Sequence, residues 1–168
     1  MNTPRASTCF LSLPLTFSLC ACLVGCDGEW DVQIDSESPG EKVVGMQASD
    51  AWTASGVEVV AGACYTVSAT IDDQWLDADE QANLDGWLET DHPLFLLFEL
   101  LRRVPDPAIG FYQLAACVDR KLDACFAIGA GATICPDRPG ELFFFVNDVP
   151  GFEGNNVGSA TIKIQPED

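Results

Sequence analysis

The sequence predicts an all-β domain of the β-sandwich class, and three segments support this prediction. In residues 64–71 and again in residues 159–165, apolar side chains alternate with polar ones, and many of them are β-branched. This period of two indicates strands with one buried face. Residues 142–146 form a continuous apolar run, which favours a strand covered on both faces. Shorter strands are expected at 57–60, 113–118 and 124–128, and many short strands between Gly-, Pro- and Asp-rich turns are typical of a sandwich.

Residues 1–25 are expected to be a secretory signal that lies outside the fold. One basic residue, Arg5, precedes an apolar run that ends at Val24. This run is shorter than the roughly 20 apolar residues that a membrane-spanning helix needs. Residues 23–26 read Leu-Val-Gly-Cys and resemble a bacterial lipobox, where the signal is cut before Cys26 and its thiol receives lipid. An ordinary secretory signal followed by a disulfide cysteine is the alternative. We expect a lipid-anchored protein of the bacterial cell envelope, on its periplasmic or outer surface.

Residues 26–42 are expected to be an acidic tether between the lipid and the domain. The stretch shows no apolar periodicity, and it contains the acids Asp27, Glu29, Asp31, Asp35, Glu37 and Glu41. The remaining residues, 43–168, are long enough for one domain with its own core. The whole chain has 26 acidic and 8 basic residues, so it lacks a basic patch that could neutralise phosphate. We therefore expect no nucleic-acid partner.

Four cysteines, Cys64, Cys117, Cys125 and Cys135, fall in the expected domain. An even number in an exported chain predicts two disulfides, with three possible pairings that the spacing does not distinguish. A metal site is less well supported, because the chain has no Cys-x-x-Cys pair and a single histidine.

Residues 94–103 interrupt the β pattern. They follow Pro93, precede Pro105 and are mostly apolar, so a short helical insertion is expected near 94–103. Its apolar residues run almost all the way round the helix. Packing into the core is the expected reason, and contact with a membrane or a partner is the alternative.

A loop rich in oxygen-bearing side chains follows the apolar run. Asp148 offers a carboxylate, and Asn155 and Asn156 offer two adjacent carboxamides. Calcium prefers such hard oxygens, and the stretch contains no thiolate or imidazole that would favour zinc. Gly151 and Gly154 permit the positive φ values of a tight ligand loop. The alternative is a plain turn between strands, because Asn, Asp, Gly and Pro fill turns in any case.

Residues 147–159 resemble the calcium loop of the PA-IL family of galactose-binding bacterial lectins. The matching residues are Asn147-Asp148-Val149-Pro150-Gly151, Gly154-Asn155-Asn156 and Gly158-Ser159. Upstream, Trp52 to Val57 followed by Ala61-Gly62 resembles the family's opening strands, and Trp75 to His92-Pro93 keeps the family's spacing without a gap. The resemblance covers most of residues 43–165. It implies a galactose-binding-like β-sandwich of the jelly-roll type.

The resemblance also implies one calcium ion, held by five protein groups. These are the side chains of Asp148, Asn155 and Asn156 and the backbone carbonyls of Phe152 and Ala78. Calcium takes 6–8 oxygen ligands, so positions remain open on the ion. In the family, two neighbouring sugar hydroxyls fill them, and vicinal hydroxyls with one axial, as in galactose, suit such a site.

The family holds an outer hydroxyl of the sugar with a His and a nearby Gln. His92 falls on the His position, so the implied sugar-binding residues are His92, Asp148, Asn155 and Asn156. The Gln position falls on or near Phe95, which cannot form that hydrogen bond. Taken without the family, a lone His before Pro is more often a surface turn residue.

The predicted function is that of a calcium-dependent, galactose-type lectin-like lipoprotein. An enzyme is not expected, because G-x-S-x-G, H-E-x-x-H and phosphate-loop motifs are all missing from the sequence. The alternative is a calcium-stabilised structural or adhesion module that binds no sugar, which Phe95 and the extra residues between 93 and 114 favour.

A second acidic stretch lacks the Gly and Glu spacing of an EF-hand and is expected to be a solvated loop. It contains Asp72, Asp73, Asp77, Asp79, Glu80 and Asp85.

Overall fold

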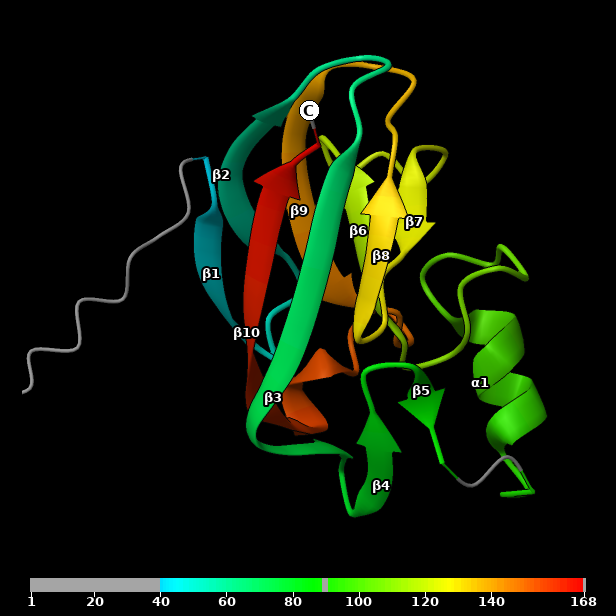
Figure 1. Cartoon of the computed structure of the whole chain (residues 1–168). Coiled ribbons are helices and arrows are strands. Elements are labelled where there is room, and N and C mark those ends of the chain that lie inside the picture. The colour runs from blue at the N-terminus through cyan, green and yellow to red at the C-terminus, as the bar shows by residue number, and fades with distance from the viewer. Residues whose placement is uncertain (1–39, 89–90, 168) are drawn as a thin grey trace, which may run out of the picture. The chain divides into compact units, whose positions relative to one another are not determined.

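A computed structural model describes residues 40–88 and 91–167 of the chain (Figure 1). The expected signal, Cys26 and all but the last three residues of the expected tether lie outside the described residues. The described residues form two antiparallel sheets and a short helix, which confirms the predicted all-β class.

The first sheet contains the two longest strands of the domain. β10 (Asn156–Pro166) lies between β1 (Lys42–Gln47) and β3 (Tyr65–Asp77), and Figure 1 shows the three side by side. On its other edge, β3 pairs with β8 (Gly131–Ile134) near its start and with β4 (Glu80–Asn83) near its end. β5 (Gly86–Trp87) completes this edge by pairing with β4. The end of β3 is therefore the point where the main sheet meets the β4–β5 hairpin.

The second sheet is built around β9. Its strands follow the order β2 (Thr53–Val59), β9 (Gly140–Val146), β6 (Leu114–Val118) and β7 (Cys125–Ala127). All residues from Leu142 to Val146 are buried, as expected for an apolar run covered on both faces.

The core lies between the sheets, where the alternating strands place their apolar side chains. Val67 of β3, Ile162 and Ile164 of β10 and Phe144 of β9 belong to one buried cluster. The polar residues between them on β3 and β10 face solvent. Each half-buried strand therefore matches the period of two in its sequence.

The four described cysteines form two disulfides, Cys64–Cys135 and Cys117–Cys125. This confirms the expected number and selects one of the three pairings. Cys64 directly precedes β3 and Cys135 directly follows β8. Because Tyr65 of β3 pairs with Ile134 of β8, the first disulfide links the two strands just beyond their last paired residues. The second bond joins directly opposed residues of β6 and β7.

The expected helix is α1 (Phe95–Leu101), and its packing differs from the expectation of a core helix. Only Phe95 and Phe98 pack against the core, and no residue of the helix is fully buried. The leucines at and within the helix are exposed, with Leu96 at 82% and Leu100 at 75% exposure. Within the described ranges, no helix is long and apolar enough to cross a membrane.

Candidate functional site

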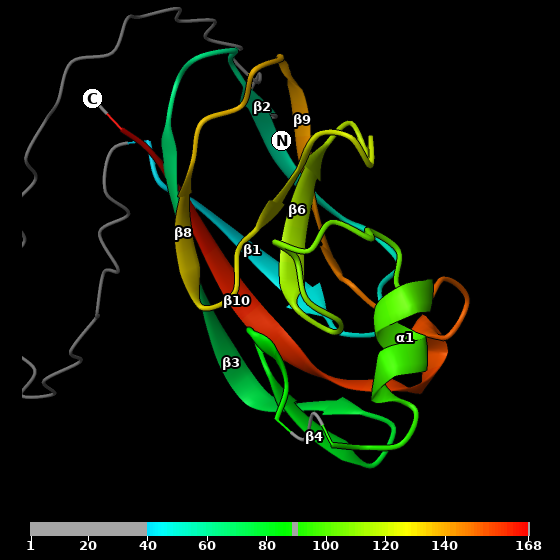
Figure 2. The ribbon, with the colours of Figure 1, turned by 90° about the vertical axis from the view of Figure 1, so that its right-hand side faces the viewer.

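The loop between β9 and β10 is anchored by Asn147, which is completely buried. Its side-chain oxygen accepts a hydrogen bond from the Val104 amide at 2.8 Å, and its amide group donates to the carbonyls of Val104 and Ile109 at 3.1 Å. Arg103 adds an ion pair with Glu153 on the loop. These contacts tie the segment after α1 to the loop, and Figure 2 shows α1 beside it. The expected helical insertion therefore forms one side of the site.

Gly158 brings the loop close to the end of β3. It has a φ of +121°, and a Cβ at this position would lie 1.8 Å from the Gln74 carbonyl oxygen. Only glycine permits this approach. The β10–β3 pairing shifts between Gly158 and Ala160. Beyond the shift, Asn156 lies directly opposite Asp77.

Asp148 is a buried carboxylate with two donors. Its side chain accepts hydrogen bonds from its neighbour's amide, Val149 N, at 2.6 Å and from Asn156 Nδ2 at 3.1 Å. Burial raises its pKa to about 6, and the nearby negative charge of Asp77 acts in the same direction. The predicted ligand Asp148 is therefore an acid whose charge is poorly solvated.

Asp77 is a second buried carboxylate at the same place, and sequence reasoning missed it. The acidic stretch is expected to be a solvated loop, and this is wrong: Asp72 and Asp73 lie within β3, Glu80 begins β4, and Asp77 is buried. β3 runs as far as Asp77, and this residue is only 7% exposed. It accepts hydrogen bonds from Asn155 Nδ2 at 2.9 Å and from Trp87 Nε1 at 3.1 Å. Burial raises its pKa. The sequence did contain a signal for its burial. Tyr65, Val67 and Trp75 point inward from alternate positions of β3, and Asp77 is the next such position after Trp75.

The two carboxamides differ in their surroundings. Asn156 is buried. Its Nδ2 donates hydrogen bonds to Asp148 Oδ2 at 3.1 Å and to the Ala48 carbonyl at 3.2 Å. Its Oδ1 is buried and has no hydrogen-bond partner. Asn155 is exposed and bonds Asp77 through Nδ2. An unpartnered buried oxygen beside Asp148 is what a cation site would leave when its ion is absent.

The two predicted carbonyl ligands also border this region. Ala78 directly follows Asp77 and has a positive φ of 51°. Its amide donates to the Asn155 carbonyl at 3.2 Å, while the Phe152 carbonyl accepts from Asn155 N at 3.2 Å. A carbonyl oxygen has two lone pairs, so the Phe152 carbonyl keeps one for a further ligand.

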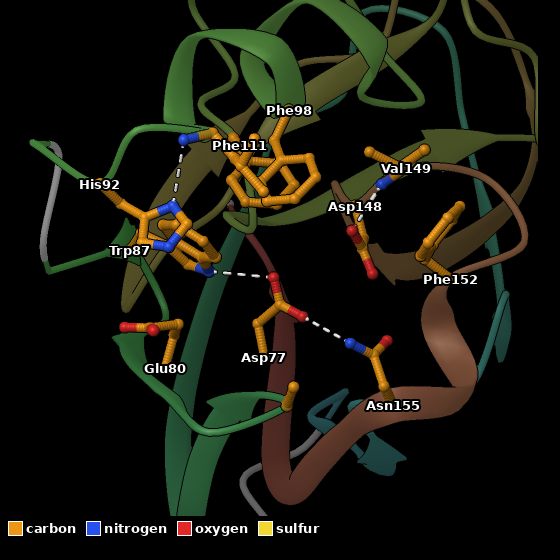
Figure 3. A pocket seen from close by; sticks show the side chains of 12 residues that line it. Asp77, Glu80, Trp87, His92, Phe98, Phe111, Asp148, Val149, Phe152 and Asn155 are labelled. Atoms are coloured by element: carbon orange, nitrogen blue, oxygen red, sulfur yellow. Dashed lines mark hydrogen bonds between the residues drawn. The ribbon is translucent and has the colours of Figure 1, made fainter.

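A cavity of about 160 Å³ opens beside these groups (Figure 3). Its polar lining includes Asp77, Asp148, Asn155 and His92, and its apolar lining includes Trp87, Leu94, Phe98, Phe111, Val149 and Phe152. The fold thus brings four of the five predicted calcium residues (Ala78, Asp148, Phe152 and Asn155) and His92 to one cavity. Asn156 does not line it, but its amide bonds Asp148.

His92 lies at the opposite wall of the cavity from the loop. Its Nδ1 accepts a hydrogen bond from Leu94 N at 3.2 Å, and its ring lies edge-on to Trp87 with the centroids 5.2 Å apart. This bond leaves Nε2 as the nitrogen that can donate to a ligand. Phe95 packs against Trp87 and Phe111 and offers no polar atom.

The donor set fits calcium better than a softer metal. In residues 40–88 and 91–167, no three His, Cys, Asp or Glu side chains form a metal-binding group. A cation here would depend on carboxamide and carbonyl oxygens together with carboxylates, and these are calcium ligands. Neither Asp77 nor Asp148 forms an ion pair with a basic side chain in the described part of the chain.

Two antiparallel sheets, joined at one end by a polar loop beside a cavity, form a β-sandwich. The solved structure of the "EclA N-terminal domain; PllA-like lectin" is similar to this chain, with a TM-score of 0.57 and 16% sequence identity. The match covers 77% of this chain and 100% of that one. Comparisons with protein-family models and with curated proteins find no match.

Proposed function

We propose that this protein is a calcium-dependent, carbohydrate-binding lipoprotein of the galactose-type lectin kind. The observation that carries the proposal is the cluster of Asp148, Asn155 and Asn156 with an unpartnered buried oxygen on Asn156. A single calcium ion would be held by these three side chains and by the carbonyls of Phe152 and Ala78. The ion would offset the cost of the buried Asp148 charge.

The sugar would bind at the cavity with two neighbouring hydroxyls on the ion. The location of His92 on the same cavity supports this, because its Nε2 is free to donate to a further hydroxyl. Asp148 and Asn155 line the cavity as well, so they would contact both ion and sugar. The likeness to a structure named as a lectin supports carbohydrate as the ligand class.

The resemblance of residues 23–26 to a lipobox supports lipid attachment at Cys26. Attachment there would anchor the domain to a membrane of the bacterial envelope through residues 26–42. The two disulfides are consistent with an oxidising compartment outside the cytoplasm.

Calorimetry tests the proposal. The purified protein, first stripped with a chelator, is titrated with Ca²⁺ and then with methyl galactoside in the presence and absence of Ca²⁺. We expect one calcium per chain and galactoside binding that depends on it. Asp148→Asn should abolish both, because it removes a charged ligand with little change in shape. Asp79→Asn is the matched control, since Asp79 is an exposed acid near the same site. Absence of calcium binding by the wild type would overturn the proposal.

A second candidate is a calcium-stabilised structural or adhesion module without sugar binding. Phe95 favours it, because this side chain packs on Trp87 and Phe111 where a sugar-binding polar group is expected. Tight calcium binding with no response to any sugar on a glycan array would select this candidate.

A further inference from the structure

Asp77 makes contacts that neither the predicted ligand set nor the proposed sugar site explains. We propose that Asp77 is a positioning residue for calcium, which fixes the carboxamide of Asn155 with its oxygen turned toward Asp148. The inference rests on the calcium part of the proposed function. It adds a residue that acts through Asn155 and not as a ligand itself.

The hydrogen-bond chemistry of a carboxylate dictates how Asn155 must lie. An ionised carboxylate only accepts hydrogen bonds, whereas a carboxamide has a donating end and an accepting end. Asn155 can therefore face Asp77 only with its NH2 group, and Nδ2 lies 2.9 Å from Asp77 Oδ1. Figure 3 shows that the Asn155 oxygen then points to the side of Asp148. The Asn155 oxygen would therefore already be oriented for calcium coordination in the calcium-free protein.

Asp77 is itself held in place on its other side. Its Oδ2 accepts from Trp87 Nε1 at 3.1 Å. Trp87 is 9% exposed, and its ring packs edge-on against Phe98 and Phe111, with the ring centroids 5.6 and 5.2 Å away. The Tyr112 hydroxyl donates to the carbonyl of Leu76, the residue before Asp77. Both oxygens of Asp77 are thus held by donors, which fixes the carboxylate in place, and Asn155 is the predicted calcium ligand that it contacts.

Two further observations indicate that this arrangement serves a cation. Asp77 and Asp148 are buried near each other, and within the described ranges neither has a basic partner. Two such charges are costly unless a positive charge offsets them. Independently, Asn156 is 6% exposed, and its Oδ1 has no hydrogen-bond partner although its Nδ2 donates to Asp148.

A double-mutant cycle on the purified full chain tests the proposal, with Ca²⁺ affinity measured by calorimetry. Asp77→Asn should weaken calcium binding about 10- to 100-fold, the range typical of groups that orient a metal ligand. An asparagine at 77 can donate as well as accept, so it no longer selects one orientation of Asn155. Asn155→Ala should weaken binding to a similar extent. The loss in the double variant should be clearly smaller than the two single losses combined, because the part of the Asp77 effect that acts through Asn155 is already missing and only the effect of the lost charge remains.

The control and the contrary results distinguish the role of Asp77 from calcium binding by the protein as a whole. Asp79→Asn should leave calcium affinity unchanged, since it removes an equal charge from an exposed neighbour. Additive losses in the double variant, or wild-type affinity in Asp77→Asn, would overturn the role of Asp77 while leaving the proposed function standing. Failure of the wild type to bind Ca²⁺ would defeat the proposed function and this inference with it.

A crystal structure of the wild type with Ca²⁺ gives a test that needs no variant to fold. We expect Asn155 Oδ1 within calcium-ligand distance, about 2.3–2.6 Å, and Asn155 Nδ2 still bonded to Asp77. An Asp77 carboxylate bound directly to the ion would overturn the positioning role.

Discussion

Raising the pH from about 5 to about 7.5 should destabilise the calcium-free protein, because Asp148 must then be charged in a buried position. The pKa of Asp148 is about 6 in the folded protein, against an ordinary value of 3.8. Between these two values the folded state binds more protons at Asp148 than the unfolded state does. Stability from this group is therefore greatest at low pH and is lost as the pH rises toward and through about 6.

The size of this effect follows from the shift in pKa. Each pKa unit corresponds to about 1.4 kcal/mol, so the full effect of Asp148 is about 3 kcal/mol. About 1.4 kcal/mol of it falls between pH 5 and pH 7.5, since the rest develops at lower pH. The raised pKa of Asp77 adds to the effect in the same direction. Calcium competes with the proton, so it should stabilise the protein more at pH 7.5 than at pH 5.

Urea unfolding in chelator, followed by tryptophan fluorescence, measures the effect. The pKa of Asp77 is also raised, so the informative quantity is the difference in pH dependence between the wild type and Asp148→Asn. The variant should lose about 1.4 kcal/mol less stability over the same pH change. Identical pH dependence in wild type and variant would refute the reasoning, because Asp148 would then have an ordinary pKa.

Three further predictions concern separate parts of the chain. His92→Ala should leave calcium affinity unchanged but weaken galactoside binding about tenfold, the cost of one hydrogen bond, and calorimetry with each ligand measures both. Gly158→Ala should cost about 2 kcal/mol or more in urea unfolding, because the added Cβ meets the Gln74 carbonyl; unchanged stability would show that the strands can separate there without cost. Cys26→Ser should block incorporation of labelled palmitate in the producing cells, and equal labelling of both proteins would exclude lipid at Cys26.

Strands with a clear period of two or a continuous apolar run were predictable from the sequence. β3, β9 and β10 belong to this group: β3 and β10 pair with each other inside one sheet, and β9 lies inside the other, between β2 and β6. The sequence did not predict four strands, β1, β4, β5 and β8. They are short or have mixed patterns of apolar and polar residues, and they become strands by pairing with β10, with β3 or with each other. For such segments, tertiary contact outweighs the weak local preference.

The site was partly predictable for a similar reason. Asp148, Asn155 and Asn156 stand close together in the sequence, so the loop could be recognised from its residues alone. Asp77 is 78 residues from Asn155, and only the β10–β3 register brings the two together. Its surroundings also misled the interpretation, since Asp72, Asp73 and Asp79 are exposed acids of the same stretch.

Helix α1 contributes a short wall of the cavity and has no buried residue. A helix of seven residues is marginal on its own. The apolar contacts of α1 with the core are those of Phe95 and Phe98, and Glu99 Oε1 accepts a hydrogen bond from Phe111 N at 2.8 Å. The backbone amides of α1 should therefore exchange with solvent deuterium through local opening, far faster than those of β9. Phe98 moves with the helix and lines the cavity, so each opening would widen the cavity without unfolding either sheet. A ligand that fills the cavity would slow this exchange, and α1 would then report on occupancy from a position outside the calcium loop.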